Sequence, residues 1–222
     1  MTADIRANLT AVRERIARAC LRAARSPDEV TLVAVTKTVP EESIRLAYDL
    51  GVRDFGENRV QEAEGKSAFF SALQPRPRLH MIGHLQSNKV RTALGIFDFI
   101  HSVDSVKLAQ TLARQAERPI PVLLEVNVAA EASKTGLAVA EVAPALAEIT
   151  KLANLDVRGL MTVAPLADDP EAVRPVFHKL RELREAYGLQ QLSMGMTDDF
   201  EVAIEEGATM IRLGRAIFGE RH

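Results

Sequence analysis

The sequence predicts an α/β protein, a single (β/α)8 TIM barrel with an extra N-terminal helix. Three observations predict it: eight short apolar segments, a helical pattern after each of them, and a repeat of about 22 to 30 residues. Strands that alternate with helices run parallel, because their crossover connections need the length of a helix. An open doubly wound sheet shares this rhythm, but no Gly-x-Gly-x-x-Gly follows the first strand. The closed barrel is therefore preferred.

The elements follow in order from periodicity. Ile5, Leu9, Val12 and Ile16 recur at helical spacing opposite a row of arginines, which predicts a helix over 3–24 that ends before Ser26-Pro27. Short runs of β-branched and other apolar residues predict strands at 31–36, 54–56, 79–83, 97–102, 121–128, 157–163, 192–196 and 210–214. Helical spacing between them, with Pro or Ser at several starts, predicts helices over 40–50, 60–71, 87–94, 105–117, 139–153, 170–187 and 199–206.

Composition excludes several classes of protein. The 222 residues include 28 basic and 30 acidic side chains, a net charge of −2, which gives no electrostatic footprint for nucleic acid or an anionic membrane. Cys20 is the one cysteine, so no internal disulfide or multi-thiolate metal site is expected. No signal peptide, membrane-length apolar run, linker or composition break is visible. We expect one cytoplasmic domain over residues 1–222.

Lys37 is the sharpest anomaly in the predicted barrel. Val33, Val35 and Lys37 share one face of the first strand, and Lys37 ends it where barrel active sites lie. A desolvated lysine loses its proton more easily and becomes a nucleophile suited to forming a Schiff base with an aldehyde or ketone. The alternative is a lysine that extends to water past the strand end.

Arg212 repeats the anomaly on the last strand, which neighbours the first once the barrel closes. An inward guanidinium would need an anionic or acceptor partner; an outward one would pair with a helix carboxylate. The segments from Ser193 to Thr197 and from Arg212 to Arg215, with Gly214 in the second, resemble phosphate loops. Thr197 could instead be a plain helix cap. An aldehyde and a phosphate together suggest pyridoxal 5′-phosphate (PLP), or the sugar phosphate of a lysine-dependent aldolase.

Other polar residues give weaker signals. His80 and His84 straddle a strand and its loop, so no metal site is predicted. His101 is interpreted as a residue that lines the mouth or caps a helix. Glu125 alternates into the barrel near its mouth, and Lys134 is interpreted as a solvated loop lysine.

Separate motif blocks are distributed along nearly the whole chain. They are Val35-Thr-Lys37-Thr, Phe55-Gly-Glu-Asn58-Arg-Val-Gln-Glu62, His80-Met-Ile-Gly-His-Leu-Gln-Ser-Asn-Lys89, Ser102-Val-Asp, Ser133-Lys-Thr-Gly136, Gly159-Leu-Met-Thr162, Leu192-Ser-Met-Gly-Met-Thr-Asp-Asp199 and Arg212-Leu-Gly-Arg-Ala-Ile-Phe-Gly219. In these blocks and their order the chain is similar to the YggS/PROSC family of pyridoxal phosphate homeostasis proteins, which resemble the N-terminal barrel of alanine racemase.

The resemblance implies a PLP site and its residues. Lys37 would carry PLP as a Schiff base, Asn58 would lie near the ring, and Arg212 would face the pyridine nitrogen. Thr197, the backbone around Gly214, and Ser193 would hold the phosphate. Threonine stands at 197 where the family usually has serine, and the hydroxyl is kept. Arginine stands at 215 where a small hydroxyl residue is common; Arg215 is retained as a cofactor-binding candidate through its charge.

The resemblance also implies binding without catalytic turnover. An arginine partner leaves the pyridine nitrogen unprotonated, which makes the cofactor a poor electron sink. Alanine racemase supplies a tyrosine from an additional β domain; here Tyr48 and Tyr187 both fall in predicted outer helices. No catalytic residue is therefore assigned. We expect a monomer that takes part in intracellular vitamin B6 and amino-acid/keto-acid homeostasis, with transient contact with PLP-dependent apoenzymes. A PLP-dependent racemase and a lysine aldolase are the alternatives.

Overall fold

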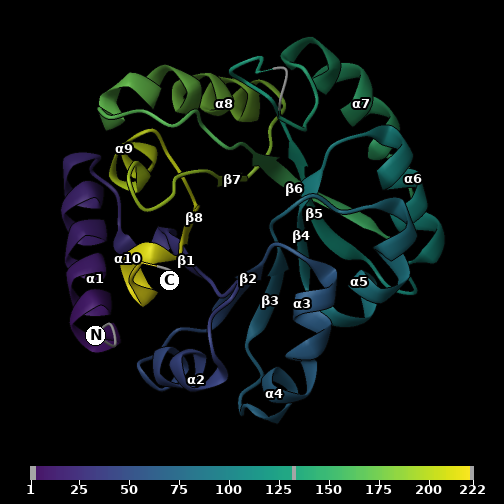
Figure 1. Cartoon of the computed structure of the whole chain (residues 1–222). Coiled ribbons are helices and arrows are strands. Elements are labelled where there is room, and N and C mark those ends of the chain that lie inside the picture. The colour runs from purple at the N-terminus through teal and green to yellow at the C-terminus, as the bar shows by residue number, and fades with distance from the viewer. Residues whose placement is uncertain (1–3, 132–133, 221–222) are drawn as a thin grey trace.

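The computed structural model describes residues 4–131 and 134–220, and its centre is a closed barrel of eight parallel strands (Figure 1). The strands follow one another around the barrel in chain order, and β8 pairs with β1 to close it. The predicted barrel is thus confirmed. The strands are β1 (Thr31–Val35), β2 (Asp54–Glu57), β3 (Arg78–Met81), β4 (Phe99–Val103), β5 (Ile120–Glu125), β6 (Leu155–Met161), β7 (Gln191–Ser193) and β8 (Met210–Leu213).

Helices surround the barrel (Figure 1). They are α1 (Ile5–Arg22), α2 (Glu41–Asp49), α3 (Val60–Gly65), α4 (Ser67–Ala72), α5 (Val90–Ile96), α6 (Val106–Gln115), α7 (Val142–Ile149), α8 (Arg174–Ala186), α9 (Phe200–Glu205) and α10 (Arg215–Phe218). Short 3-10 turns precede α5, α7 and α8 at Ser87–Lys89, Val139–Glu141 and Pro170–Val173, and another lies at Pro27–Glu29.

The alternation of side chains along each strand divides the core into two layers. Outward residues such as Ala34 and Ile211 join the large cluster that the helices cover. Inward residues form a small separate cluster of Phe99, Leu123 and Met210, together with Met161. The barrel interior is therefore a packed core, and polar side chains inside it must find partners there.

Helix α1 covers the seam where the barrel closes (Figure 1). It contacts α9 and α10, and the Asn8 amide donates to the carbonyl of Ile217 at 3.0 Å. Arg15 also pairs with Glu201 of α9 at 2.8 Å. The extra N-terminal helix thus ties the beginning of the chain to its last two helices.

One predicted helix is divided in the structure. Residues 60–71 were expected to form one helix, but α3 ends at Gly65 and α4 begins at Ser67. Lys66, between them, turns its side chain inward, where its ammonium donates to the Thr36 carbonyl at 2.7 Å and to Glu57 at 2.8 Å. The Lys66 ammonium thus neutralises the buried carboxylate of Glu57, and the helix is interrupted at the residue that supplies this ammonium.

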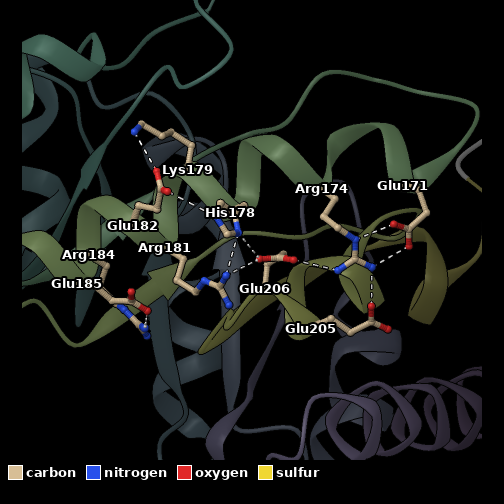
Figure 2. Close-up of polar contacts among 10 residues, drawn as sticks. All are labelled: Glu171, Arg174, His178, Lys179, Arg181, Glu182, Arg184, Glu185, Glu205 and Glu206. Atoms are coloured by element: carbon tan, nitrogen blue, oxygen red, sulfur yellow. Dashed lines mark hydrogen bonds and ion pairs between the residues drawn. The ribbon is translucent and has the colours of Figure 1, made fainter.

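An ionic network joins α8 to α9 on the outside of the molecule (Figure 2). Arg174 pairs with Glu171, Glu205 and Glu206 at 2.6, 2.6 and 3.0 Å. His178 and Arg181 each contact Glu206 at 3.2 Å.

In the part of the chain that the structure describes, no helix combines the length and apolar character needed to cross a membrane.

Candidate functional site

Lys37 and Arg212 come from neighbouring strands at one end of the barrel. Arg212 on β8 is in register with Val33 on β1, and Lys37 follows β1 by two residues. All strands are parallel, so their C-terminal ends form one rim, called here the mouth of the barrel. Lys37 is half-buried at this mouth. The predicted adjacency of the two strands is confirmed.

The turn that carries Lys37 is held on both sides by side chains of α3 and its surroundings. The carbonyl of Thr36 accepts a hydrogen bond from Lys66, and the amide of Thr38 donates to a carboxylate oxygen of Glu62. Thr38 has a positive φ of 61°, an uncommon conformation for threonine. The backbone at Lys37 is thus fixed by specific partners. Sequence reasoning missed this support, because a single glycine such as Gly65 is tolerated inside a helical pattern and does not by itself predict a break.

Arg212 points into the barrel, which is the first of the two orientations considered from the sequence. It is 5% exposed, and its two terminal nitrogens donate to the hydroxyl of Ser193 at 2.5 Å and to the carbonyl of Thr162 at 2.8 Å. Burial lowers the pKa of Arg212 to about 10, against the opposing charges of Asp199 and Glu125. The guanidinium therefore remains a cation at neutral pH.

A chain of hydrogen bonds continues from Ser193 across the barrel interior. The Ser193 hydroxyl lies 2.9 Å from Nδ1 of His101, whose Nε2 lies 3.0 Å from Nδ1 of His80. Nε2 of His80 lies 2.9 Å from Asp54. The interpretation of His101 as a mouth-lining or capping residue is wrong: its side chain is fully buried, because it sits at the centre of β4 on the inward face. Ser193 is also fully buried, and its part in a phosphate site stays a prediction.

Asn58 follows β2 at the mouth and brings a buried polar atom without a hydrogen-bond partner, its Oδ1. A Cβ built on Gly83 would lie 2.3 Å from the backbone oxygen of Asn58, so only glycine allows these two loops to approach. An amide left unsatisfied in a buried position is expected to be completed by a ligand or water. The Asn58 Oδ1 atom thus leaves one acceptor at the mouth that a polar ligand or a water molecule can use.

The loops after β7 and β8 lie together. The amide of Ala216 donates to the Thr197 hydroxyl at 3.4 Å, and the amide of Arg212 donates to the carbonyl of Gly195 at 3.0 Å. Gly214 precedes α10 and is buried. Arg215 is exposed, and its guanidinium pairs with Asp198 and with Glu220. These two carboxylates hold the pKa of Arg215 above its usual value, so its charge is already matched.

The carboxyl groups of Glu125 and Asp199, at the mouth, interact with the charge of Arg212. Burial raises the pKa of Glu125 above its usual value, although a hydrogen bond from Thr135 at 2.7 Å and the charge of Arg212 oppose this. Burial likewise raises the pKa of Asp199, whose carboxylate accepts from the Met196 amide at 2.6 Å. Glu125 was expected here. The role of Asp199 as a charge partner of Arg212 was not predicted, since an aspartate just before a helix is also an ordinary cap.

The loop after β5 closes on itself near the mouth. Lys134 forms an ion pair with Glu131 and donates to the carbonyl of Val163 at 3.3 Å, so it is held by partners rather than fully solvated. Ser133, part of one of the motif blocks, lies outside the described residues. Within residues 4–131 and 134–220, no group of three or more His, Cys, Asp or Glu could hold a metal ion.

Comparison with known proteins defines the class first. Residues 6–222 match the family model described as "Alanine racemase, N-terminal domain". An alanine racemase from Clostridium difficile superposes with a TM-score of 0.75 at 14% identity, covering 98% of this chain and 57% of the racemase, which shows a shared fold. The chain is thus a barrel of the alanine racemase N-terminal type.

Closer relatives define the family. The pyridoxal phosphate homeostasis protein of Pseudomonas aeruginosa is 46% identical, covering 96% of this chain and 94% of its own. That of Escherichia coli K12 is 41% identical, covering 98% and 97%. PipY of Synechococcus elongatus, solved with PLP bound, superposes with a TM-score of 0.80 at 40% identity, covering 94% of this chain and all of PipY. The chain belongs to the family of pyridoxal phosphate homeostasis proteins.

Proposed function

We propose that this protein binds PLP as a Schiff base on Lys37 and takes part in intracellular vitamin B6 and amino-acid/keto-acid homeostasis. One observation carries the proposal: Lys37 and the buried cation Arg212 stand at the same end of adjoining strands β1 and β8. The names of the relatives and the PLP-bound structure of PipY support the choice of ligand.

Each proposed residue has a defined task. The bound cofactor supplies an aldehyde for the amine and an electron-withdrawing ring. The fixed turn around Lys37 presents that amine at the mouth, and the amide of Asn58 would contact the bound ring. Thr197 and the backbone at Gly214 hold the phosphate, while Arg215, although paired with Asp198, lies at the edge of this loop.

Arg212 sets the character of the site. The guanidinium remains cationic and donates hydrogen bonds only, so it cannot take a proton from a pyridine nitrogen. A ring nitrogen facing it stays unprotonated, and the ring then withdraws electrons weakly. This arrangement favours holding the cofactor over turning over an amino acid.

We also propose that the site is not catalytic. A racemase needs a second acid–base group across the ring, and neither tyrosine is placed to serve. The Tyr48 hydroxyl donates to the carbonyl of Pro75 at 2.9 Å in the outer layer, and Tyr187 packs against the outer core. Measurable interconversion of alanine enantiomers by the pure, PLP-loaded protein would contradict this part of the proposal.

Borohydride reduction tests the anchor. The PLP-loaded protein should show a visible absorption band and, after reduction and digestion, carry phosphopyridoxyl on the peptide that contains Lys37. Lys37→Ala should lose the band and the modified peptide, because the substitution removes the amine that forms the Schiff base. Lys134→Ala is the matched control and should keep both. A Lys37→Ala protein that retains the full band would overturn the assignment.

The wider setting is proposed on the same basis. We expect a single cytoplasmic domain that acts as a monomer and contacts PLP-dependent apoenzymes transiently. Lys134 and Arg215 lie close enough to the mouth to take part in passing the cofactor on. Sedimentation of the PLP-loaded protein, alone and with an apoenzyme, measures the oligomeric state and the contact; a stable dimer would contradict the monomer.

A further inference from the structure

A continuous row of hydrogen bonds crosses the barrel interior from the mouth toward the N-terminal ends of the strands. It runs from Arg212 through Ser193, His101 and His80 to Asp54. The three middle residues are at most 1% exposed, and they come from β7, β4 and β3. Asp54 opens β2 and forms an ion pair with the exposed Arg78 at 2.8 Å. A cation thus stands at one end of the row and a carboxylate at the other.

With both histidines neutral, the two charged ends determine every proton position between them. The Asp54 carboxylate can only accept, so His80 must carry its proton on Nε2. A neutral His80 then accepts at Nδ1, and His101 must donate from Nε2. Nδ1 of His101 in turn accepts from the Ser193 hydroxyl, and that hydroxyl oxygen accepts from Arg212. Each donor therefore points away from the mouth.

The burial of His101 supports this assignment. Burial, with the nearby charge of Arg212, holds the pKa of His101 well below its usual value, so its imidazole is neutral. A neutral imidazole has one donor and one acceptor nitrogen, and each faces a partner here. At the far end, burial disfavours the charge on Asp54, but hydrogen bonds from His80 and Arg78, with the charge of Arg78, lower its pKa.

We propose that His101, His80 and Asp54 are positioning residues for Arg212. They fix the proton of the Ser193 hydroxyl on the side of His101, so that its oxygen lone pair faces the guanidinium and holds one terminal nitrogen in place. The carbonyl of Thr162 holds the other nitrogen. The guanidinium plane is thereby set from the opposite end of the barrel. Its relevance to PLP rests on the function proposed above, but the proton order is a property of the protein alone.

Nuclear magnetic resonance on the cofactor-free protein tests the proton order. With ¹⁵N-labelled histidine, two-bond proton–nitrogen correlations distinguish the two neutral tautomers, and the His101→Asn variant assigns the signals of His101. We expect His101 protonated at Nε2 and unprotonated at Nδ1 at neutral pH. A proton on Nδ1 in the unsubstituted protein would mean that the row runs the other way, and the proposal would be overturned.

Asp54→Asn tests whether the carboxylate at the far end of the row determines the proton positions near Arg212 at the mouth. An amide can donate as well as accept, so the single proton order is lost and His101 should show both tautomers. The apparent dissociation constant for PLP should rise about tenfold, the cost of one weakened buried hydrogen bond. Asp98→Asn is the control, because Asp98 pairs with Arg76 at the same end of the barrel and does not touch the row. An Asp54→Asn protein with one unchanged His101 tautomer and unchanged affinity would overturn the proposal.

Ser193 provides a rescue test. Ser193→Ala removes the hydroxyl between His101 and Arg212 and should weaken PLP binding about tenfold, whereas Ser193→Thr keeps the hydroxyl and should restore most of the loss. Equal weakening in both variants would contradict a role for the hydroxyl. The tautomer measurement needs no cofactor. A protein that fails to bind PLP would therefore contradict the proposed function but not the proton order. A His101 protonated at Nδ1 would contradict the proton order but not the proposed function.

Discussion

The barrel interior and the α8–α9 surface use the same kinds of residue in opposite ways. The interior row links Arg212 to Asp54 through single hydrogen bonds, each with one possible donor, and its histidines are fully or almost fully buried. On the surface, Arg174 contacts three carboxylates, and Glu206 is shared by Arg174, His178 and Arg181 (Figure 2). The first arrangement has no spare partner, and the second has several.

Exposure explains the difference. Water can replace a lost partner of Arg174, whose side chain is 31% exposed, so the surface network tolerates loss and stabilises modestly. Inside the barrel an abandoned donor or acceptor finds no substitute and keeps its desolvation cost. A buried row of hydrogen bonds therefore specifies one arrangement, whereas a surface network distributes its stabilisation over many.

The largest expected effect comes from breaking the interior row. His101→Leu removes both its bonds, leaving His80 and Ser193 each without a buried partner, and should lower the free energy of unfolding by about 3 kcal/mol. Urea unfolding at neutral pH measures this. The same substitution at His178, whose side chain is 49% exposed, is the control and should cost less than about 0.5 kcal/mol. Equal losses at the two sites would remove the contrast between the regions.

A smaller effect is expected at the centre of the surface network. Arg174→Ala separates α8 from three carboxylates and should cost about 1 kcal/mol at low ionic strength. Most of that loss should disappear in about 1 M salt, because the charges are then screened over about 3 Å. Urea unfolding of both proteins at the two ionic strengths tests this. A loss of unfolding free energy that does not change with salt would show that solvent does not screen the charges of the network, and would contradict the contrast with the interior.

The smallest effect concerns pH. Burial disfavours the charge on Glu205, but hydrogen bonds from Arg174 and Arg22 outweigh it and hold the pKa of Glu205 below its usual value of 4.5. A lowered carboxyl pKa contributes stability that is present above 4.5 and lost as pH falls through the folded-state value. Glu205→Gln should therefore cost about 0.5 kcal/mol at pH 7 and nothing near pH 3. Unfolding curves of the two proteins that stay equally far apart at both pH values would contradict this.

Much of the fold could be predicted from the sequence because apolar alternation and helical spacing are local signals. They located every strand, although ends moved by a few residues, as at β7, which ends at Ser193 instead of continuing to 196. The division of 60–71 at Lys66 escaped, because a lone glycine such as Gly65 does not by itself end a helical pattern, and the carboxylate of Glu57 that Lys66 contacts lies on another element. Lys37 and Arg212 stood out as charges on apolar strands. The row through His101 did not, because its members lie on separate strands and meet only across the closed barrel.

The closure of the barrel by β8, at the seam that α1 covers, has a consequence for how the protein is synthesised. β8 is synthesised after the other seven strands of the barrel. Until β8 and α10 leave the ribosome, β1 has an unpaired edge and Asn8 lacks its acceptor on α10. The row of hydrogen bonds also lacks its guanidinium during that time. The site is therefore assembled late in synthesis. A nascent chain that stalls before Met210 should expose the unpaired edge of β1, which can pair with other chains or bind chaperones.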